Sequence, residues 1–291
     1  MTIGTYIAPA SLDEAVAALE DGSAIPFAGG TDIIPQTMTG RDVPAVVDIK
    51  RLDELNVIER RDDAWIIGAG VACYRLGAHE ALKNAFPGLV EAASLIGSTQ
   101  IQGRATIGGN VGNASPAADT VPALLANRAT VDIIGPDGFR TIPIDEVITG
   151  PGSTSLTPGE FMVRFVLPIR NGAMDAGLRF IPRTEMDIAV ANAAASIALD
   201  ADGKCASADI AIGGVGPRAL HLPDAGAALV GASALDDEIL DRVADACRVA
   251  ADPIDDKRGT VAYRRHAIGV LATRATRIAW QRANTLREEQ A

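Results

Sequence analysis

The amino-acid sequence predicts an α+β protein built from three consecutive regions. Helix and strand patterns alternate along residues 1–170, whereas two long strands followed by two long helices dominate the remainder. The chain has 291 residues, which suggests two domains of ordinary size or three small ones. We place the boundaries near Asn56 and near residues 170–172, which gives regions 1–56, 57–170 and 171–291.

The first region reads as a small αβ unit. Ser11 is a suitable N-cap for a helix that ends near Glu20, because Glu14 follows it at the capping-box distance. Apolar residues recur at helical spacing within that stretch. Short strands are expected at Ala24–Ala28 and Pro44–Ile49, and the first runs directly into two glycines.

The second region alternates strands, helices and one long polar loop. The helix over residues 89–96 ends at Gly97, as helices commonly do. The expected elements are a strand and turn at Ala64–Val71, helices at Tyr74–Phe86 and Leu89–Ile96, a loop at Gly103–Asp119, and strands at Ala129–Gly135 and Phe161–Leu167.

The third region combines strands with two long helices. Strands Ile188–Asp200 and Ala206–Gly213 flank a turn, and helices follow at Asp236–Ala251 and Thr260–Arg287. The final helix carries an apolar face formed by Ile268, Leu271, Ala275, Ile278 and Ala279. Most of its arginines lie elsewhere on the helix: Arg264, Arg265, Arg274, Arg277 and Arg282. This basic run predicts a solvated face, and the alternative is a docking face for an acidic partner.

Composition excludes several classes of protein. Hydrophobic residues make up 48% of the chain, which is enough for a sizeable core. The formal net charge of −11 argues against a nucleic-acid-binding protein, which needs a basic face. The longest apolar stretch, residues 188–199, falls short of the ~20 residues that a membrane span needs, and no secretory signal is evident.

The cysteines argue against a metal or iron–sulfur centre within this chain. Cys73, Cys205 and Cys247 are isolated from one another, so no CxxC spacing exists, and the histidines are scattered as well. We therefore expect three buried structural thiols and no metal ligands. A sparse, odd number of cysteines also fits the reducing cytoplasm, which is the location we predict.

A glycine-rich segment follows the first predicted strand, over residues 28–35. Gly29 and Gly30 can adopt positive φ angles and can bring the backbone close to a ligand. Successive N–H groups of such a segment form a nest for an anion such as phosphate, and Thr31 adds a hydroxyl donor. The alternative is an ordinary tight turn.

A second segment, residues 106–119, is rich in glycine, hydroxyl and amide groups. Its glycines suit a phosphate, and Asp119 could accept hydrogen bonds from a ribose or an adenine. The alternative is a surface loop without a function. Two phosphate-type loops suggest a dinucleotide whose diphosphate lies between them. The chain lacks a P-loop, and residues 68–73 fail the last position of the Rossmann fingerprint.

The two segments and their order resemble the FAD-binding medium subunit of molybdenum hydroxylases. That family includes the flavoprotein of aerobic carbon monoxide dehydrogenase and the flavin domain of xanthine dehydrogenase. The resemblance rests on Ala28–Asp32, Thr106–Asn110, Ser115–Thr120, Arg183 with Asp187–Ala189, Gly214–Pro217 and Tyr263–Arg265. It implies two small α/β subdomains that clamp FAD, in a PCMH/vanillyl-alcohol-oxidase-like fold, and a C-terminal domain with a three-stranded antiparallel sheet and helices.

The resemblance also implies the cofactor-binding residues and no catalytic residue. The full set is Ala28, Gly29, Gly30, Thr31, Asp32, Ile33, Ile101, Thr106, Ile107, Gly108, Gly109, Asn110, Asn113, Ser115, Asp119, Met162, Arg179 and Ile188. Residues 29–32 and 108–110 would hold the pyrophosphate, and Asn113, Ser115 and Asp119 the ribityl and adenosine parts. Met162 and Ile188 would lie near the flavin, with plain core packing as the alternative.

Two departures from relatives refine this expectation. Thr31 stands where some relatives carry histidine, which implies non-covalent FAD, and Gln102 stands where relatives often have arginine. By resemblance, the chain is the electron-transfer subunit of a heterotrimer, in which molybdopterin and [2Fe–2S] clusters belong to the large and small partner subunits. A dimer of heterotrimers is expected, without nucleic acid or a membrane segment.

Alternative functions are a self-sufficient FAD-dependent oxidase or dehydrogenase, and a nucleotide-binding scaffold subunit without a redox role. The substrate of the complex stays open among carbon monoxide, a purine, an N-heterocycle and an aldehyde. The electron acceptor stays open among NAD, a quinone and oxygen.

Overall fold

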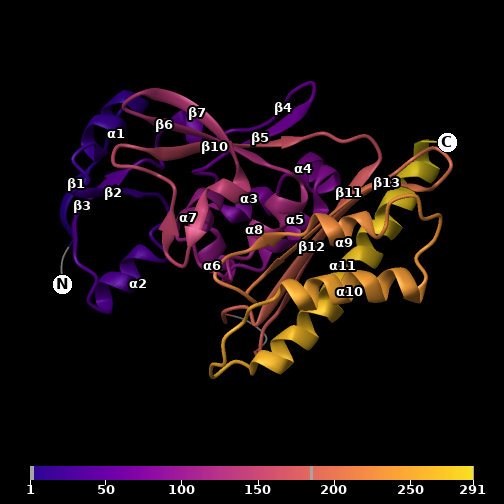
Figure 1. Ribbon diagram of the computed structural model, residues 1–291. Helices are drawn as coiled ribbons and strands as arrows, with labels where there is room; N and C mark the ends of the chain where they lie inside the picture. The colour runs from indigo at the N-terminus through magenta and orange to yellow at the C-terminus, as the bar shows by residue number, and fades with distance from the viewer. Residues whose placement is uncertain (1–2, 184–185, 291) are drawn as a thin grey trace.

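The computed structural model describes residues 3–183 and 186–290, and its strands form three main sheets (Figure 1). The first sheet has the order β1-β3-β2 and is parallel throughout. Its strands are β1 (Ile3–Ile7), β2 (Ala24–Phe27) and β3 (Val43–Asp48), connected through α1 (Leu12–Leu19) and α2 (Ile33–Met38). Ser11 caps α1 as predicted, because its Oγ accepts from the Glu14 N–H at 3.2 Å. Strand β1 and helix α2 were not predicted.

The second sheet is antiparallel, in the order β4-β5-β10-β6-β7. Its strands are β4 (Ile58–Arg60), β5 (Ala64–Gly68), β6 (Thr130–Gly135), β7 (Gly138–Pro143) and β10 (Phe161–Pro168). Short elements lie between β7 and β10: the 3₁₀ turn η2 (Ile144–Glu146) and the hairpin β8 (Ile148–Gly150) and β9 (Ser153–Thr154). Another 3₁₀ turn, η1 (Asp53–Leu55), precedes β4.

The helices between β5 and β6 are α3 (Cys73–Gly77), α4 (Glu80–Ala85), α5 (Pro87–Ser94), α6 (Thr99–Gln102), α7 (Ile107–Gly112) and α8 (Thr120–Ala126). They depart from the expected pattern in several places: α6 and α8 were not predicted, and two further differences have a clear local cause. The single helix expected over 74–86 is two helices, because extended His79 ends α3 and its Nδ1 caps α4 through the Leu82 N–H. The loop expected over 103–119 contains α7, since Thr106 caps Gly109 and starts a helix there.

The third sheet is antiparallel, in the order β11-β12-β13-β14. Its strands are β11 (Ala173–Phe180), β12 (Ala191–Leu199), β13 (Cys205–Gly213) and β14 (Leu220–His221). The three expected strands are therefore joined by a fourth, two-residue strand. Strand β12 begins at Ala191 rather than at Ile188, because the Ile188 N–H donates to the Asp187 side chain instead of to a neighbouring strand.

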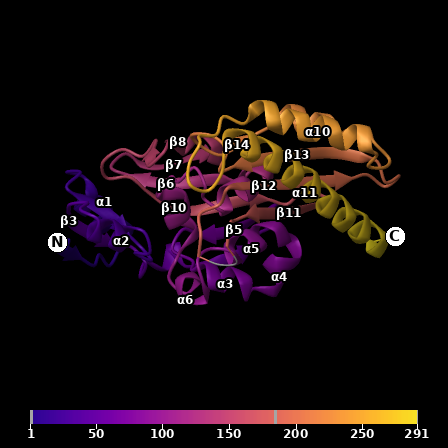
Figure 2. The ribbon, with the colours of Figure 1, turned by 90° about the horizontal axis from the view of Figure 1, so that it is seen from below.

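Alanine-rich β12 lies between two layers of helices. Helices α9 (Pro223–Ala227), α10 (Asp237–Ala250) and α11 (Val261–Gln290) follow the sheet, and α10 and α11 lie on the side opposite α5 (Figure 2). Strand β12 contacts α11 and also α8, and every one of its residues is buried. Small side chains allow helices to approach both faces of this strand closely.

The final helix confirms its predicted apolar face but not the position of Arg264. Ile268, Leu271, Ala275 and Ala279 are buried, and Ile278 is half-buried. Arg264 was expected on the solvated face, yet its side chain is buried. Its guanidinium donates to backbone carbonyls of Val190 and Gly214 at 2.8 and 2.9 Å and pairs with Asp256 at 2.7 Å. The guanidinium is buried because it donates to carbonyl oxygens at the end of the sheet. Helical periodicity alone does not predict such a contact.

The three cysteines are free and buried, as expected. Burial raises the pKa of Cys73 and Cys247 to about 12 and that of Cys205 to about 11, so these thiols stay protonated at neutral pH. Within residues 3–183 and 186–290, no helix is long and apolar enough to cross a membrane. The same residues contain no group of three histidine, cysteine or acidic side chains placed to hold a metal.

Candidate functional site

A cavity of about 430 Å³ is lined by residues of β2, α7 and β10 and of the loops that adjoin them. Its size falls within the range of ~300–1,000 Å³ that is usual for small-molecule sites. Most of its lining comes from three separate parts of the chain, residues 24–33, 106–113 and 154–162, and single residues such as Arg41 and Ala69 complete it. The sequence-predicted site residues that line it are Ala28, Gly29, Gly30, Thr31, Asp32, Ile33, Thr106, Gly108, Gly109, Asn113 and Met162.

The first glycine segment supplies free hydrogen-bond donors to this cavity. Gly30 has a φ of +74°, a left-handed conformation that favours glycine. Among the described residues, no acceptor lies within hydrogen-bonding reach of the backbone N–H groups of residues 29–33. A Cβ at Gly29 would lie 2.0 Å from the Arg104 carbonyl oxygen, so the first segment packs against the backbone just before the second segment. The first segment therefore has the character of an anion nest.

The second glycine segment contributes shape rather than free backbone donors. The N–H of Gly108 donates to the Ala69 carbonyl at 3.0 Å, and those of Gly109 and Asn110 donate to Thr106 at 2.9 Å each. A Cβ at Gly108 would lie 2.6 Å from the Ala69 oxygen, so only glycine allows this approach. The first turn of α7 therefore borders the cavity with small residues only. The backbone N–H groups of this turn already donate hydrogen bonds within the protein, so they are not available to a ligand.

The structure places several other predicted residues outside the cavity lining. Ile107 is buried in the core, and the Asn110 side chain accepts from the N–H and hydroxyl of Thr120 at 3.1 and 2.7 Å. Ile101 packs half-buried against the core. The Ser115 hydroxyl accepts from the Ala117 N–H at 3.3 Å. Ser115 and Ile101 are likewise absent from the residues that line the cavity.

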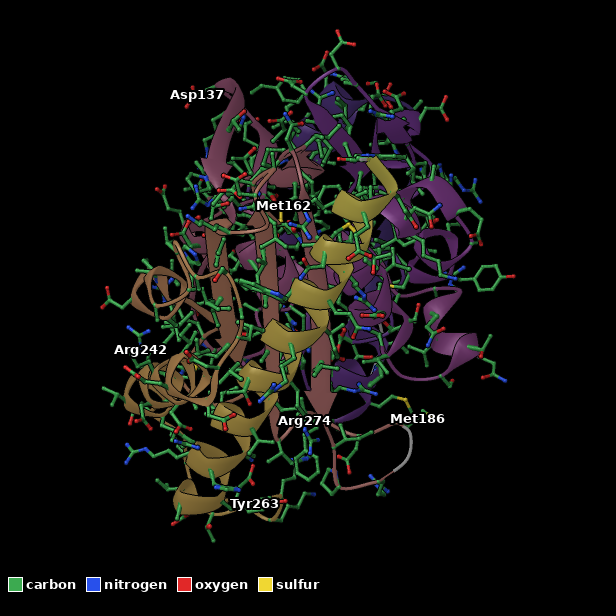
Figure 3. All side chains as sticks on the ribbon, turned by 90° about the vertical axis from the view of Figure 1, so that its right-hand side faces the viewer. Asp137, Met162, Met186, Arg242, Tyr263 and Arg274 are labelled. Carbon is green, nitrogen blue, oxygen red and sulfur yellow. The ribbon has the colours of Figure 1, made fainter. Side chains whose placement is uncertain are left out.

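Met162 and Ile188, both expected near a flavin, occupy different environments. Met162 is 6% exposed and lines the cavity, with its methyl 3.3 Å from the position of a Cβ on Gly112. Ile188 is 52% exposed and does not line the cavity. Figure 3 shows Met162 inside the molecule and Met186, two residues before Ile188, at its edge.

Asp119 and Arg179 form a buried ion pair outside the lining of this cavity, next to Pro122 and Asn192. The Arg179 Nη1 lies 3.0 Å from the Asp119 Oδ2, and both side chains are largely buried. Burial raises the pKa of Asp119 to about 6, although the Arg179 charge works in the opposite direction. The Asp119 Oδ1 is buried without a geometrically formed hydrogen bond among the described residues, and the Asn192 side chain lies close enough to oppose the rise in the Asp119 pKa.

The sequence reasoning missed several cavity residues, among them parts of β2 and two groups that bear on ligand binding. One is Arg41, a cation on the lining that follows α2. The other is the segment 154–161, which reaches the cavity through the β8–β9 hairpin. Glu160 holds that segment: it pairs with Arg140 at 2.6 Å and accepts from the Thr157 N–H at 2.8 Å. The hydrogen bond from Arg140 lowers the pKa of Glu160 to about 2. No local sequence signal marks a loop that acts through tertiary contacts.

The residues present fit a dinucleotide cofactor. Unpaired amides of the first glycine segment and the Arg41 guanidinium suit the negative charges of a diphosphate. Apolar side chains such as Ile33, Leu156 and Met162 offer surface to an uncharged ring.

Comparisons with known proteins point to the same cofactor. Residues 2–170 match the family described as "FAD binding domain in molybdopterin dehydrogenase", and residues 176–279 match "CO dehydrogenase flavoprotein C-terminal domain". The 6-hydroxypseudooxynicotine dehydrogenase complex subunit alpha of Paenarthrobacter nicotinovorans is 31% identical, over 97% of this chain and 96% of its own. The carbon monoxide dehydrogenase medium chain of Afipia carboxidovorans is 31% identical, over 96% and 97% respectively.

A solved structure shows that the likeness extends to the whole fold. A chain of the reconstituted CO dehydrogenase from Oligotropha carboxidovorans superposes with a TM-score of 0.92 at 30% identity, covering 97% of this chain and 99% of that one. The predicted fold class is thereby confirmed. The two family models, the full-length relatives and the shared architecture lead to one conclusion: this chain belongs to the family of FAD-binding medium subunits of molybdenum hydroxylases.

Proposed function

We propose that this chain binds FAD non-covalently in the 430 Å³ cavity and passes electrons from [2Fe–2S] clusters of a partner subunit to an external acceptor. The observation that carries the proposal is the row of unbonded backbone N–H groups at residues 29–33, directly on the cavity wall. Such donors match a diphosphate better than an uncharged metabolite.

Each wall of the cavity would have a separate task. Residues 29–33 bind the diphosphate. Gly108 and Gly109, which have no side chains, let the backbone of α7 lie close to it. Met162 and Leu156 exclude water from the apolar part of the cofactor. Asp119, paired with Arg179, is not in the lining, so its contact with the ribityl or adenosine part is proposed from the family resemblance alone. FAD supplies one- and two-electron redox chemistry when it is bound.

Non-covalent binding is consistent with the side chains at the cavity. Among the described lining residues there is no histidine, cysteine or tyrosine, the side chains that could act as a nucleophile toward a flavin. Glu160, a carboxylate on the lining, is engaged by Arg140. The chain is therefore suited to holding and orienting a cofactor rather than to acid–base catalysis on a substrate.

The remaining parts of the proposal concern the assembly. We propose a large subunit with molybdopterin, a small subunit with [2Fe–2S] clusters, and a dimer of such heterotrimers. The relatives named above, a medium chain and a complex subunit, support assembly. The three buried free thiols support a reducing compartment such as the cytoplasm. A separate sheet in each part of the chain supports the division into 1–56, 57–170 and 171–291.

Reconstitution tests the cofactor. The purified full-length chain is incubated with FAD, freed of excess ligand and examined by absorbance, and the flavin is then released by denaturation. We expect a flavin band in the folded protein and FAD in the supernatant of the denatured protein, since the attachment is non-covalent. A reconstituted chain without a flavin band would refute the proposal.

Reduction of the assembled complex tests the electron-transfer role. With the complex loaded with FAD, addition of its substrate should bleach the flavin band, whereas the isolated chain should not turn over that substrate. Turnover by the isolated chain would instead support the self-sufficient oxidase or dehydrogenase. Tight binding of ADP without any flavin reduction in the complex would support the scaffold function.

A further inference from the structure

The turn after α2 has a geometry that directs one arginine back toward the cavity. The N–H of Arg41 donates to the Gln36 carbonyl at 3.0 Å, and that of Gly40 donates to the Thr37 carbonyl at 3.2 Å. Gly40 has a φ of +106°, which favours glycine. These two bonds and the left-handed residue define a Schellman motif. In that motif the residue that follows the glycine lies beside the residue four positions before the glycine. Here this places Arg41 next to Gln36.

The side chains of this motif form a bridge to the second glycine segment. The Arg41 Nη1 donates to the Gln36 Oε1, and the Gln36 Nε2 donates to the Asn113 Oδ1 at 3.1 Å. Gln36 is half-buried, whereas Arg41 is exposed and lines the cavity together with Asn113. Gln36 thus fixes the Arg41 guanidinium through its oxygen and is itself fixed through its nitrogen.

Arg41 is the one lysine or arginine among the described residues that line the cavity. The same lining contains two carboxylates, Asp32 and Glu160, of which Glu160 is neutralised by Arg140. The whole chain carries a formal net charge of −11, so an anionic ligand approaches an acidic protein. A single fixed cation beside the unbonded amides of residues 29–33 would offset that repulsion where a diphosphate enters.

We propose that Arg41 is a binding residue for the diphosphate of the cofactor and that Gln36 is the residue that positions it. This inference rests on the proposed binding of FAD in the same cavity. The guanidinium offers further N–H donors besides the one used by Gln36, so it can contact a phosphate oxygen without breaking the bridge. Gln36, Arg41 and Asn113 then link both glycine segments across the diphosphate.

Binding of FAD to the apo chain tests the proposal, with quenching of flavin fluorescence as the readout. Arg41→Ala should weaken FAD about tenfold at low salt, as expected for an exposed cation beside a doubly charged anion. Arg41→Lys should recover most of the affinity, because the charge is retained. Gln36→Leu should cause a smaller loss, of about threefold, since the cation stays but loses its support.

Two measurements separate binding from structural effects. The difference in affinity between wild type and Arg41→Ala should shrink as salt is raised to 1 M, because the interaction is electrostatic and exposed. Adenosine, which lacks phosphate, should bind both proteins equally. Arg61→Ala is the matched control, since Arg61 is also exposed and pairs weakly with Glu59 at 3.5 Å, away from the cavity.

The outcomes are distinguishable. Failure of the wild-type chain to bind FAD would overturn the proposed function and this inference with it. If wild type binds FAD and Arg41→Ala binds within about twofold of it, Arg41 is not a diphosphate ligand. A tenfold loss that is independent of salt, or that Arg41→Lys fails to recover, would also overturn the proposal, because charge would then not be its cause.

Discussion

Replacement of Arg264 by alanine should destabilise the third sheet more than any surface substitution on the same helix. Arg264 lies near the start of α11 and is 5% exposed. It donates to the carbonyl oxygen of Val190, just before β12, and to that of Gly214, just after β13. A single side chain therefore joins the ends of two adjacent strands to a helix.

The magnitude follows from the groups that lose a partner. Truncation leaves the buried Val190 carbonyl oxygen and the half-buried Gly214 carbonyl oxygen without this donor, at ~1–3 kcal/mol each with the second at the lower end. The ion pair with Asp256, whose side chain is 30% exposed, adds less than about 1 kcal/mol. An opposing contribution comes from the Nε of Arg264, which is buried without a partner among the described residues and whose removal is favourable. We expect the free energy of unfolding to fall by about 3 kcal/mol.

Urea unfolding provides the measurement, followed by circular dichroism and by the fluorescence of Trp280, which is buried on the same helix. Arg274→Ala is the matched control, because Arg274 is exposed on α11, and it should change the free energy of unfolding by less than about 0.5 kcal/mol (Figure 3). If Arg264→Ala lies within about 1 kcal/mol of this control, the carbonyl contacts do not stabilise the sheet ends as argued.

Three further predictions concern the cavity and its neighbours. Gly29→Ala would place a methyl 2.0 Å from the Arg104 oxygen, so it should lower the free energy of unfolding by more than ~2 kcal/mol and weaken FAD binding at least ~tenfold. The pKa of Asp119 is raised to about 6, so the folded apo chain binds its proton more tightly than the unfolded chain. Stability should therefore fall as pH rises from about 4 to 6, by up to ~3 kcal/mol, and Asp119→Asn should remove that part of the profile. Glu160→Gln loses its ion pair with Arg140, which is 37% exposed, and should lower the free energy of unfolding by about 1 kcal/mol in urea titrations.

Each of these has an outcome that contradicts it. Normal FAD affinity in Gly29→Ala would mean that the close approach of Gly29 to the Arg104 backbone is not needed for binding. An unchanged pH profile in Asp119→Asn would mean that its carboxyl titrates as it does in the unfolded chain. For Glu160→Gln, stability equal to wild type would show that the segment 154–161 is held by other contacts.

Local sequence patterns were sufficient to place a helix end where a single residue determines it. The cap at Ser11 and the turn at Gly97 could be placed because helix ends need particular side chains and left-handed backbone. Helix α7 was missed because its glycines have low helix propensity, and it forms because Thr106 caps it and its N–H groups reach Ala69 and Thr106. Local patterns did not locate β1 or β11, although the resemblance implied a third strand in the last sheet, because the partners of both strands lie elsewhere in the chain.

The sequence by itself determined the family, the cofactor and the two glycine segments. One segment follows a strand and the other follows a helix cap, and glycine at these places lets the backbone come close to a diphosphate. Tertiary structure alone decided which donors are free. It showed that the amides of residues 29–33 are unbonded whereas those of residues 108–110 are not. It also placed Arg41 on the cavity and buried Arg264, because a hydrogen-bond partner distant in sequence decides where a long cationic side chain ends.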